Sequence, residues 1–336
     1  MSAAVKPVIG VTMGDAAGIG PEIVVRALVE PEVREACHAI VIGDAGIMRD
    51  AVALTGLPCE IRAVSSVAEA EFRDGTIDVL DLRNIARSDF EPGRISAACG
   101  RAFVEYIRRA ARMALSGEID AVASAPTNKE AMHAAGEIYP GQTEIFAEES
   151  RSTDPFTILT GGKMRVFLVS SHVSLSQAIA LVTQPRIELV IRKAVASLKE
   201  LWGIDDPLIG VAGLNPHAGD GGLFGREEIE HVIPVLERLR AEGIRIEGPG
   251  PADSVYDRAD RGAYDGVIGM YHDQGVIPLK RYGYVTVISG TPIIRTTAGH
   301  GTAYDIAWKG IGRANVMQRA VVLAAELAAS RAARAR

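Results

Sequence analysis

The amino-acid sequence predicts an α/β fold in which helices cover both faces of a largely parallel β-sheet. Short apolar runs alternate with helical patterns along the whole chain of 336 residues, and 48% of the residues are hydrophobic. At about 100–200 residues per domain, this length predicts two domains or one large α/β unit with a sizeable core. We find no internal repeat and no low-complexity linker, so the sequence marks a domain boundary only weakly.

Seven short runs rich in β-branched and small residues predict the strands of this sheet. They cover residues 8–13, 39–44, 77–82, 121–126, 166–171, 208–215 and 266–271. Continuous apolar runs of this length, separated by helices, are typical of strands that are buried on both faces of a parallel sheet. A three-layer α/β/α arrangement follows from that pattern.

Helical patterns fill the gaps between these strands. Pro21 stands at a first helical position, where its missing N–H costs nothing. Phe103, Tyr106, Ile107 and Ala110 recur with the spacing of one apolar helix face. The expected helices cover residues 21–30, 96–117, 184–202, 226–242 and 314–336.

The composition excludes several classes of protein. Cys37, Cys59 and Cys99 are odd in number and lack C-x-x-C spacing, so neither a disulfide framework nor a zinc ribbon is expected. A formal net charge of −6 without a long basic run argues against nucleic acid, and no stretch of about 18 apolar residues predicts a membrane span. The first residues show no signal-peptide pattern, so we expect a cytoplasmic protein.

Three histidines are the clearest candidates for chemistry. His172, His217 and His272 each follow a predicted strand, and the carboxyl ends of strands are where open α/β sheets bind their ligands. Three neutral imidazoles with an open position suit a catalytic divalent metal. A single histidine is more often a hydrogen-bonded loop residue, so only the shared strand-end context of the three predicts a metal site.

Other loop residues have the charge or shape to bind substrate. Asp253 and Asp273 are carboxylates that could orient an imidazole or transfer a proton, although Asp253 also lies in good turn sequence. Lys129, Lys280 and Arg295 are cations beside predicted strand ends, and Arg offers a bidentate fork to phosphate or carboxylate. Surface charges are the alternative interpretation of these three cations.

Two glycine-containing segments could approach a cofactor closely. Residues 14–22 form a turn between a strand and a helix, where backbone N–H groups can meet an anion. Their G-x-x-x-G-x-G spacing is not the dinucleotide fingerprint, so a tight connection is an equal alternative. Residues 297–307 form a small-residue loop around His300 that suits a nucleotide base or phosphate.

Together these segments resemble the 4-hydroxythreonine-4-phosphate dehydrogenase family of vitamin B6 biosynthesis and its relatives that act on 4-phosphothreonate or 4-phosphoerythronate. The resemblance spans nearly the whole chain, and NPHAG (215–219) together with YHDQG (271–275) is a specific pair. The other segments are GDAAGIGPE (14–22), SAPTNKEA (124–131), GQTEIFAE (141–148), SSHVSLSQAI (170–179), GPADSV (250–255) and IRTTAGHGTAYDIAWKG (294–310).

The resemblance implies a two-domain fold similar to the isocitrate and isopropylmalate dehydrogenases, with a cleft between the domains. One domain would contain residues 1–125 and 291–336 with the cofactor loop, and the other residues 126–290 with the metal and substrate residues. It further implies a homodimer with a shared active site, in which His272 of the partner completes a metal site formed by His172 and His217.

The implied reaction oxidises a secondary hydroxyl with NAD or NADP, and the β-keto acid then loses carbon dioxide. The divalent ion, Zn, Mg, Mn or Co, would lower the alcohol pKa and hold the enolate. The substrate-binding residues would be Gln142, Thr143, Lys280, Thr286 and Arg295. The catalytic residues would be Lys129, Asp253 and Asp273. The cofactor would contact Gly299, His300, Gly301, Thr302 and Asp305.

The chain departs from the family pattern at two positions of the phosphate site. Gln142 replaces a usual histidine, and Thr286 aligns with a usual asparagine, whereas Thr143, Lys280 and Arg295 are retained. The leading hypothesis is therefore a small 4-phosphorylated 3-hydroxy acid as substrate. The alternatives are the same chemistry on an unphosphorylated sugar acid or an aromatic dihydrodiol carboxylate, and a non-catalytic ligand-binding homologue.

Overall fold

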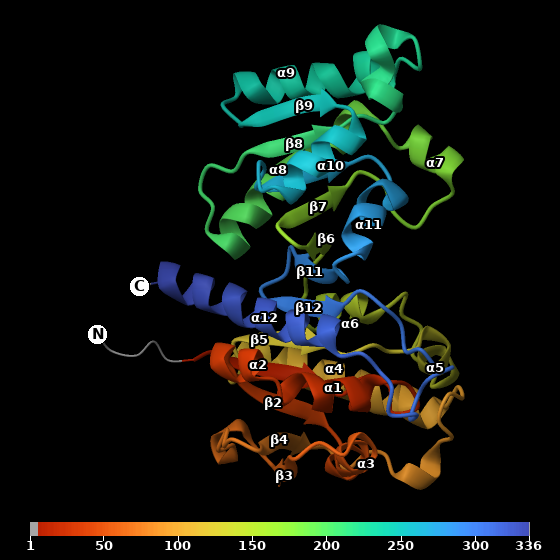
Figure 1. The fold of residues 1–336 in the computed structure, drawn as a ribbon, viewed down its shortest axis with the longest axis vertical. Coiled ribbons are helices and arrows are strands. Elements are labelled where there is room, and N and C mark those ends of the chain that lie inside the picture. The colour runs from red at the N-terminus through yellow and green to blue at the C-terminus, as the bar shows by residue number, and fades with distance from the viewer. Residues whose placement is uncertain (1–5, 336) are drawn as a thin grey trace. The chain divides into compact units, whose positions relative to one another are not determined.

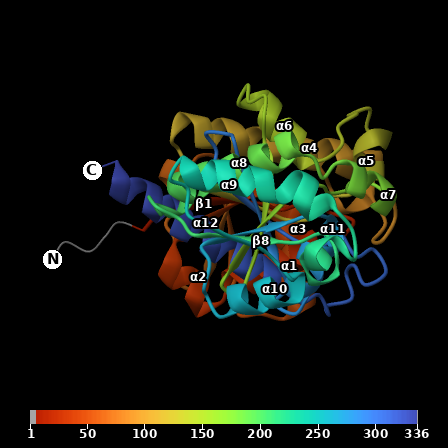
Figure 2. The same ribbon diagram turned by 90° about the horizontal axis from the view of Figure 1, so that it is seen from above.

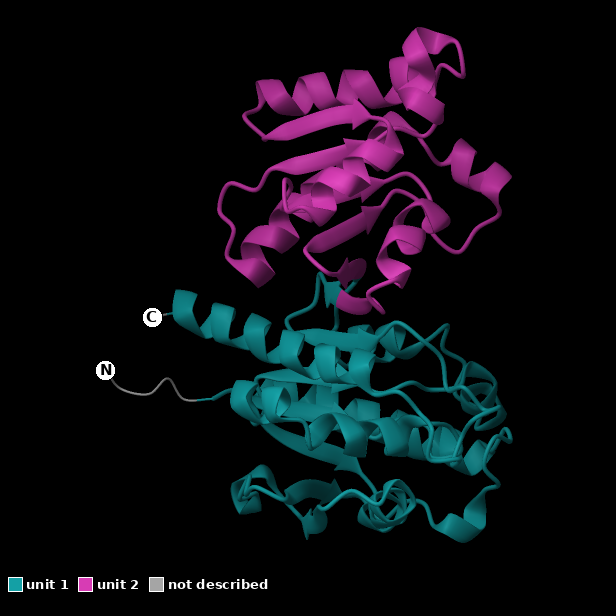
Figure 3. Ribbon diagram, viewed as in Figure 1, with its two compact units in different colours: residues 1–155, 288–336 teal, residues 156–287 magenta. Residues whose placement is uncertain are grey.

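The computed structural model describes residues 6–335, which divide into two compact units (Figure 3). Unit 1 contains the described residues up to Pro155 and those from Ile288 onward, and unit 2 contains Phe156–Val287. The sequence predicts a domain boundary after residue 125. The first part of unit 1 instead continues to Pro155, because residues 126–155 carry two helices that pack on it. The second predicted boundary, after residue 290, lies three residues beyond the boundary in the structure, which follows Val287.

The sheet of unit 1 is parallel, with the strand order β3-β4-β2-β1-β5-β12 (Figure 1). Thr12 of β1 pairs with Ser124 of β5, which pairs with Thr297 of β12, so three strands end at one edge. The strands are β1 (Val8–Thr12), β2 (His38–Gly43), β3 (Glu60–Val64), β4 (Thr76–Asp81), β5 (Ala121–Ser124) and β12 (Arg295–Ala298).

Helices cover both faces of this sheet (Figure 2). One face packs against α1 (Gly20–Leu28), α2 (Pro31–Ala36), α3 (Ala45–Thr55) and α12 (Asn315–Arg334). The other face packs against α4 (Ala97–Ser116), whose outer side carries α5 (Lys129–Ala134) and α6 (Gln142–Glu149). The Ser96 hydroxyl caps α4 by accepting from the Cys99 N–H, and a left-handed Gly117 ends it.

The strand order of unit 2 is β6-β7-β10-β8-β9. Every pair is parallel except the antiparallel hairpin of β6 and β7, and the remaining strand, β11 (Val285–Ser289), spans the boundary of the units. The strands are β6 (Phe156–Gly161), β7 (Met164–Leu168), β8 (Ile209–Ala212), β9 (Ile246–Gly250) and β10 (Gly266–Gly269).

The helices of unit 2 also form two layers. In Figure 2, α8 (Gln184–Trp202) and α9 (Ile233–Ala241) lie on one side of its strands and α10 (Ala252–Asp260) on the other, where α11 (His272–Lys280) also packs. The short helix α7 (Leu175–Ala180) follows β7. A buried cluster that includes Val166, Tyr256, Val267 and Leu279 joins the α10–α11 layer to the sheet.

The predicted α/β class, with largely parallel strands between helical layers, is confirmed in each unit. All seven predicted strands and all five predicted helices are present, the helix at 226–242 as a π-turn over Glu228–Val232 followed by α9. No helix among residues 6–335 is long and apolar enough to span a membrane. Cys37, Cys59 and Cys99 are free thiols, as the sequence predicts.

Candidate active site

Two of the predicted metal ligands lie side by side at the carboxyl ends of β7 and β10. His172 follows β7 and is exposed, His272 begins α11, and their ring centroids are 5.5 Å apart. Two imidazoles on one tetrahedral ion, with metal–nitrogen distances of about 2.0–2.1 Å, have ring centres about 5 Å apart. The spacing of the pair is close to that value, whereas the resemblance assigns His272 to the site of a partner copy. A cavity of about 180 Å³ lined by His172, His272 and Asp273 opens there.

The third predicted ligand, His217, lies on a loop after β8 with an unusual backbone. His217, Ala218 and Asp220 all have positive φ, at 54°, 54° and 42°, and the glycines beside them share that left-handed conformation. Within the described residues 6–335, no group of three or more histidine, cysteine, aspartate or glutamate side chains could hold a metal ion. One chain therefore brings His172 and His272 together without His217.

The predicted catalytic carboxylates line one groove of unit 2. Asp253 near the start of α10 and Asp273 in the first turn of α11 are both exposed, and they face a groove of about 420 Å³ with Tyr256 and Tyr271 in its wall. Asp273 Oδ1 lies 2.7 Å from His272 Nδ1. This contact favours a proton on Nδ1, which leaves Nε2 of His272 free to bind a metal.

Arg295 begins β12 and is almost fully buried, with 3% of its surface exposed. Its Nε donates to the Ser124 hydroxyl at 3.2 Å, and its terminal nitrogens donate to the Thr143 hydroxyl at 3.0 Å and the Gln142 side-chain oxygen at 3.2 Å. The guanidinium also lies 4.8 Å from the centre of the Phe146 ring. These contacts are all to neutral groups, and burial lowers the pKa of Arg295 to about 10, although the charge of Glu144 acts in the opposite direction.

Gln142 and Thr143 are the first two residues of α6, so the structure brings three of the five predicted substrate residues together in unit 1. Gln142 is held at both ends of its amide, because its Nε2 also donates to the Ala125 carbonyl at 3.1 Å. The side chain that replaces the usual histidine thus contacts the arginine and the end of β5. The other two residues, Lys280 and Thr286, belong to unit 2, and Lys280 is exposed with its ammonium 5.7 Å from the Tyr284 ring centre.

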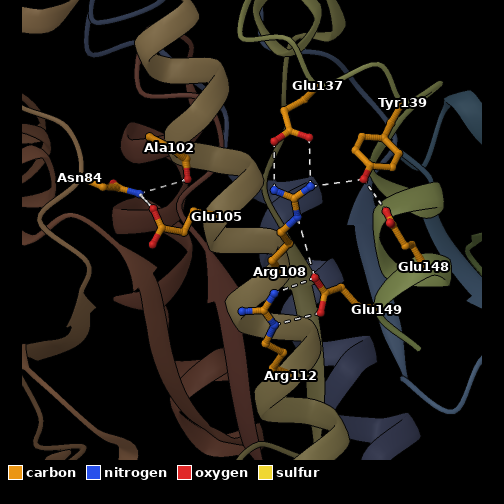
Figure 4. Close-up of polar contacts among 9 residues, drawn as sticks. All are labelled: Asn84, Ala102, Glu105, Arg108, Arg112, Glu137, Tyr139, Glu148 and Glu149. Atoms are coloured by element: carbon orange, nitrogen blue, oxygen red, sulfur yellow. Dashed lines mark hydrogen bonds and ion pairs between the residues drawn. The ribbon is translucent and has the colours of Figure 1, made fainter. Parts of the chain in front are cut away.

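A network of ion pairs fixes the segment that carries α6 against α4 (Figure 4). Arg108 binds Glu137 through two hydrogen bonds of 3.0 Å, and Arg112 binds Glu149 through bonds of 2.9 and 3.0 Å. Tyr139 accepts from Arg108 and donates to Glu148, and this bond to Glu148 raises the tyrosine pKa. Bidentate pairs are geometrically specific, so the network sets where α6 begins. Lys129, the remaining predicted catalytic residue, is exposed in the first turn of α5.

The predicted cofactor loop packs against the glycine-rich turn in unit 1. The Ile19 N–H donates to the Thr302 carbonyl at 3.0 Å, and a Cβ on Gly18 would lie 2.9 Å from the Thr302 Cβ. Thr302 is buried, whereas Gly301 and Asp305 are exposed at the surface of the loop. The predicted cofactor residues lie on this segment after β12: Gly299, His300, Gly301, Thr302 and Asp305.

Tyr304, Asp15 and Trp308 also connect the cofactor loop to the glycine-rich turn, and the sequence pattern did not single them out. Tyr304 donates to the buried Asp15 carboxylate at 2.6 Å, and burial raises the pKa of Asp15. The Trp308 indole donates to the Ala16 carbonyl at 2.7 Å from a left-handed backbone with φ of 59°. A tyrosine and a tryptophan in an otherwise small-residue loop are the sequence signal that could have indicated them.

The fold and these groups define a class of protein: an α/β enzyme with paired imidazoles at strand ends and a buried arginine whose hydrogen bonds go to neutral side chains. Residues 35–324 match the family described as pyridoxal phosphate biosynthetic protein PdxA. The chain belongs to this family and is a dehydrogenase.

Relatives cover nearly the whole chain. A protein of Symbiobacterium thermophilum, provisionally named D-threonate 4-phosphate dehydrogenase, is 41% identical over 328 residues, which cover 97% of this chain and 98% of that one. The crystal structure of a 4-hydroxythreonine-4-phosphate dehydrogenase from Klebsiella pneumoniae is 44% identical, with a TM-score of 0.88, and covers 97% of this chain and 99% of that chain. A terephthalate 1,2-cis-dihydrodiol dehydrogenase from Burkholderia xenovorans is 32% identical with a TM-score of 0.60, over 93% and 95% of the two chains.

Proposed function

We propose that this protein is a divalent-metal-dependent NAD(P) dehydrogenase that oxidises the 3-hydroxyl of a small 4-phosphorylated hydroxy acid. The substrate would be of the 4-phosphohydroxythreonine or 4-phosphothreonate and 4-phosphoerythronate type, and the β-keto acid formed would lose carbon dioxide. The names of the relatives from S. thermophilum and K. pneumoniae support a phosphorylated substrate.

The observation that carries this proposal is the environment of Arg295. A buried guanidinium is normally balanced by a carboxylate, because an unpaired buried charge costs several kcal/mol. Arg295 instead contacts two hydroxyl groups, an amide oxygen and an aromatic ring. Two hydrogen bonds from its terminal nitrogens leave further N–H groups for a ligand, since a guanidinium has five. The charge of Glu144 offsets this burial only in part, and an anionic substrate group would supply negative charge in direct contact.

The histidines fit the metal that this reaction uses. Imidazole nitrogens suit zinc and cobalt, and substrate oxygens in the open positions would also suit magnesium or manganese. When bound, the ion would polarise the hydroxyl and stabilise the enolate that decarboxylation leaves. The contribution of this chain is the orientation of His272 by Asp273, together with a carboxylate, Asp253 or Asp273, at the same groove to accept or return a proton.

The nicotinamide cofactor is assigned to the loop from Gly299 to Asp305. The close packing of Thr302 on the glycine-rich turn holds this loop next to a helix N-terminus, that of α1, which is favourable for phosphate groups. Lys129 is assigned to the reaction as a cation that borders Gly141 and thus the start of α6.

A second copy of the chain would complete the site as a homodimer. The surface of unit 2 around the imidazole pair exposes large apolar side chains, with Val173, Leu175 and Ile179 exposed by 45%, 61% and 43%. Ile277, on the helix that His272 begins, is exposed by 71%. Exposed apolar groups of this kind mark protein contacts. The three free thiols support a cytoplasmic location.

Turnover with a panel of acids tests the proposal. We expect reduction of NAD or NADP with 4-phosphothreonate, 4-phosphoerythronate or 4-phosphohydroxythreonine, and competitive inhibition by inorganic phosphate. Turnover of unphosphorylated sugar acids or dihydrodiol carboxylates without phosphate competition would replace the proposed substrate by the alternative class. Absence of turnover with every acid, in the presence of divalent metal and either cofactor, would contradict dehydrogenase chemistry of this kind.

A further inference from the structure

A chain of hydrogen bonds crosses unit 2 beneath the three histidine loops. The Ser170 hydroxyl donates to the Met270 carbonyl at 2.9 Å, and the Met270 N–H donates to Gln274 Oε1 at 2.6 Å. Gln274 Nε2 then donates to the Gly213 carbonyl at 2.8 Å. These bonds connect the ends of β7, β10 and β8, which are neighbours in the sheet. We call this set, together with Glu228 described next, the strand-end belt.

Glu228 anchors the last part of the belt. It is 1% exposed, and its Oε1 accepts from the N–H groups of Leu214 and Asn215, each at 2.8 Å. Its Oε2 accepts from the Asn215 side chain at 2.8 Å. A buried carboxylate is costly unless such donors satisfy it, so its position is tightly coupled to the loop.

The loop that Glu228 anchors is the one with left-handed backbone. His217 is two residues beyond Asn215, and non-glycine residues rarely adopt the positive φ of His217, Ala218 and Asp220. Such a conformation persists only where its surroundings hold it. The bonds from Glu228 to Leu214 and Asn215 fix the start of this segment.

Each predicted ligand is two residues from a belt contact. His172 follows Ser170, His272 follows Met270, and His217 follows Asn215, each at a separation of two. A peptide of that length has little freedom, so a shift in the belt moves the imidazoles. The belt thus joins three loops that are distant in sequence to one hydrogen-bonded frame.

We propose that Ser170, Gln274 and Glu228 are positioning residues that hold the loops of His172 and His217 in place for one metal ion, and the loop of His272 in place for the ion that it shares with a partner copy. This inference rests on the proposed function, because it needs the histidines to be ligands. Residues that hold metal ligands through hydrogen bonds typically change metal affinity by about 10- to 100-fold when they are replaced. We expect effects of that size from the belt.

Titration of the chelator-treated protein with Co²⁺, followed by its visible absorption, tests the proposal without reference to activity. Gln274→Met removes both contacts of the amide, and Glu228→Gln puts an N–H group in place of one acceptor oxygen. We expect both to weaken Co²⁺ binding by about 10- to 100-fold and to change the spectrum. Glu230→Gln, an exposed glutamate on the same π-turn, is the matched control and should bind Co²⁺ as the wild type does.

The outcomes separate the belt from the metal site itself. If Gln274→Met and Glu228→Gln keep their circular dichroism and bind Co²⁺ with wild-type affinity and spectrum, the belt does not position the ligands. If either variant fails to fold, Ser170→Ala decides, because it deletes one hydroxyl: weaker binding supports the belt and wild-type binding refutes it. If His172→Ala and His217→Ala bind Co²⁺ as tightly as the wild type, the proposed metal site is wrong.

Discussion

Replacing Arg295 with methionine removes the buried guanidinium while keeping an unbranched side chain, and we expect substrate binding to fail although the fold survives. Burial lowers the pKa of Arg295 from its ordinary value to about 10. That difference corresponds to about 3 kcal/mol against the charged form in the free protein. Because the folded pKa is the lower one, this destabilisation is fully present below pH 10 and is relieved as the pH rises from there toward the unfolded pKa.

The substitution removes this destabilisation and also deletes the hydrogen bonds to Ser124, Thr143 and Gln142. At about 1 kcal/mol for each bond, the two effects nearly cancel, so the free energy of unfolding should change by less than about 2 kcal/mol. Two hydrogen bonds from a guanidinium to an anion contribute about 1.5–3 kcal/mol each. Losing them should raise the KM for a phosphorylated substrate by about 100-fold or more.

Urea unfolding measures the change in the free energy of unfolding, and the phosphate dependence of the melting temperature measures anion binding. We expect phosphate to raise the melting temperature of the wild type and to leave that of Arg295→Met unchanged. Arg109→Met, which removes a solvent-accessible cation from α4 that lies outside the α6 network, is the control and should keep the phosphate response. If Arg295→Met lost more than about 4 kcal/mol of stability and still responded to phosphate, the guanidinium would be a structural cation and the reasoning would be refuted.

Three further predictions concern neighbouring features. Gln142→Glu should raise the KM for the phosphorylated substrate by about tenfold or more, because the new carboxylate would pair with the arginine, whereas Gln142→His should stay near wild type in steady-state kinetics. In a shared site to which one chain supplies His172 and His217 and its partner supplies His272, mixing inactive His172→Ala and His272→Ala proteins should restore about a quarter of the activity, and mixing His172→Ala with His217→Ala should restore none. Tyr304→Phe should lower the unfolding free energy by about 1–3 kcal/mol near neutral pH, because the buried Asp15 loses a donor. Burial raises the pKa of Asp15, so urea unfolding at acidic pH, where the carboxyl is protonated, should show a smaller loss.

Among residues 6–335, the sequence predicted seven of the twelve strands and missed β3, β6, β9, β11 and β12. β3 is an edge strand with the sequence EIRAV, and β9 at the other edge contains Pro249, so neither has a continuous apolar run. β12 is buried although it reads RTTA, because tertiary contacts satisfy its polar side chains. Thr296, for example, donates to the Ala320 carbonyl of α12 at 2.7 Å. Local patterns do not reveal such contacts.

The candidate site was predictable as a set of strand-end residues, but its internal connections were not. The strand-end context identified His172 and His272, and the structure places their rings side by side. The contact of Gln274 with Gly213 spans 61 residues, and that of Arg295 with Gln142 spans 153. Bonds across such separations depend on the assembled sheet, so the sequence could suggest the ligands but not the residues that hold them.

Removal and return of the metal test the central proposal most directly. The protein would be stripped with a chelator, its metal content measured, and the reduced nicotinamide formed from a 4-phosphorylated 3-hydroxy acid followed before and after addition of a divalent ion. We predict that turnover disappears with the metal and returns with about one ion per site, and that His217→Ala does not recover. Full turnover by metal-free wild-type protein, or by His217→Ala, would contradict the account.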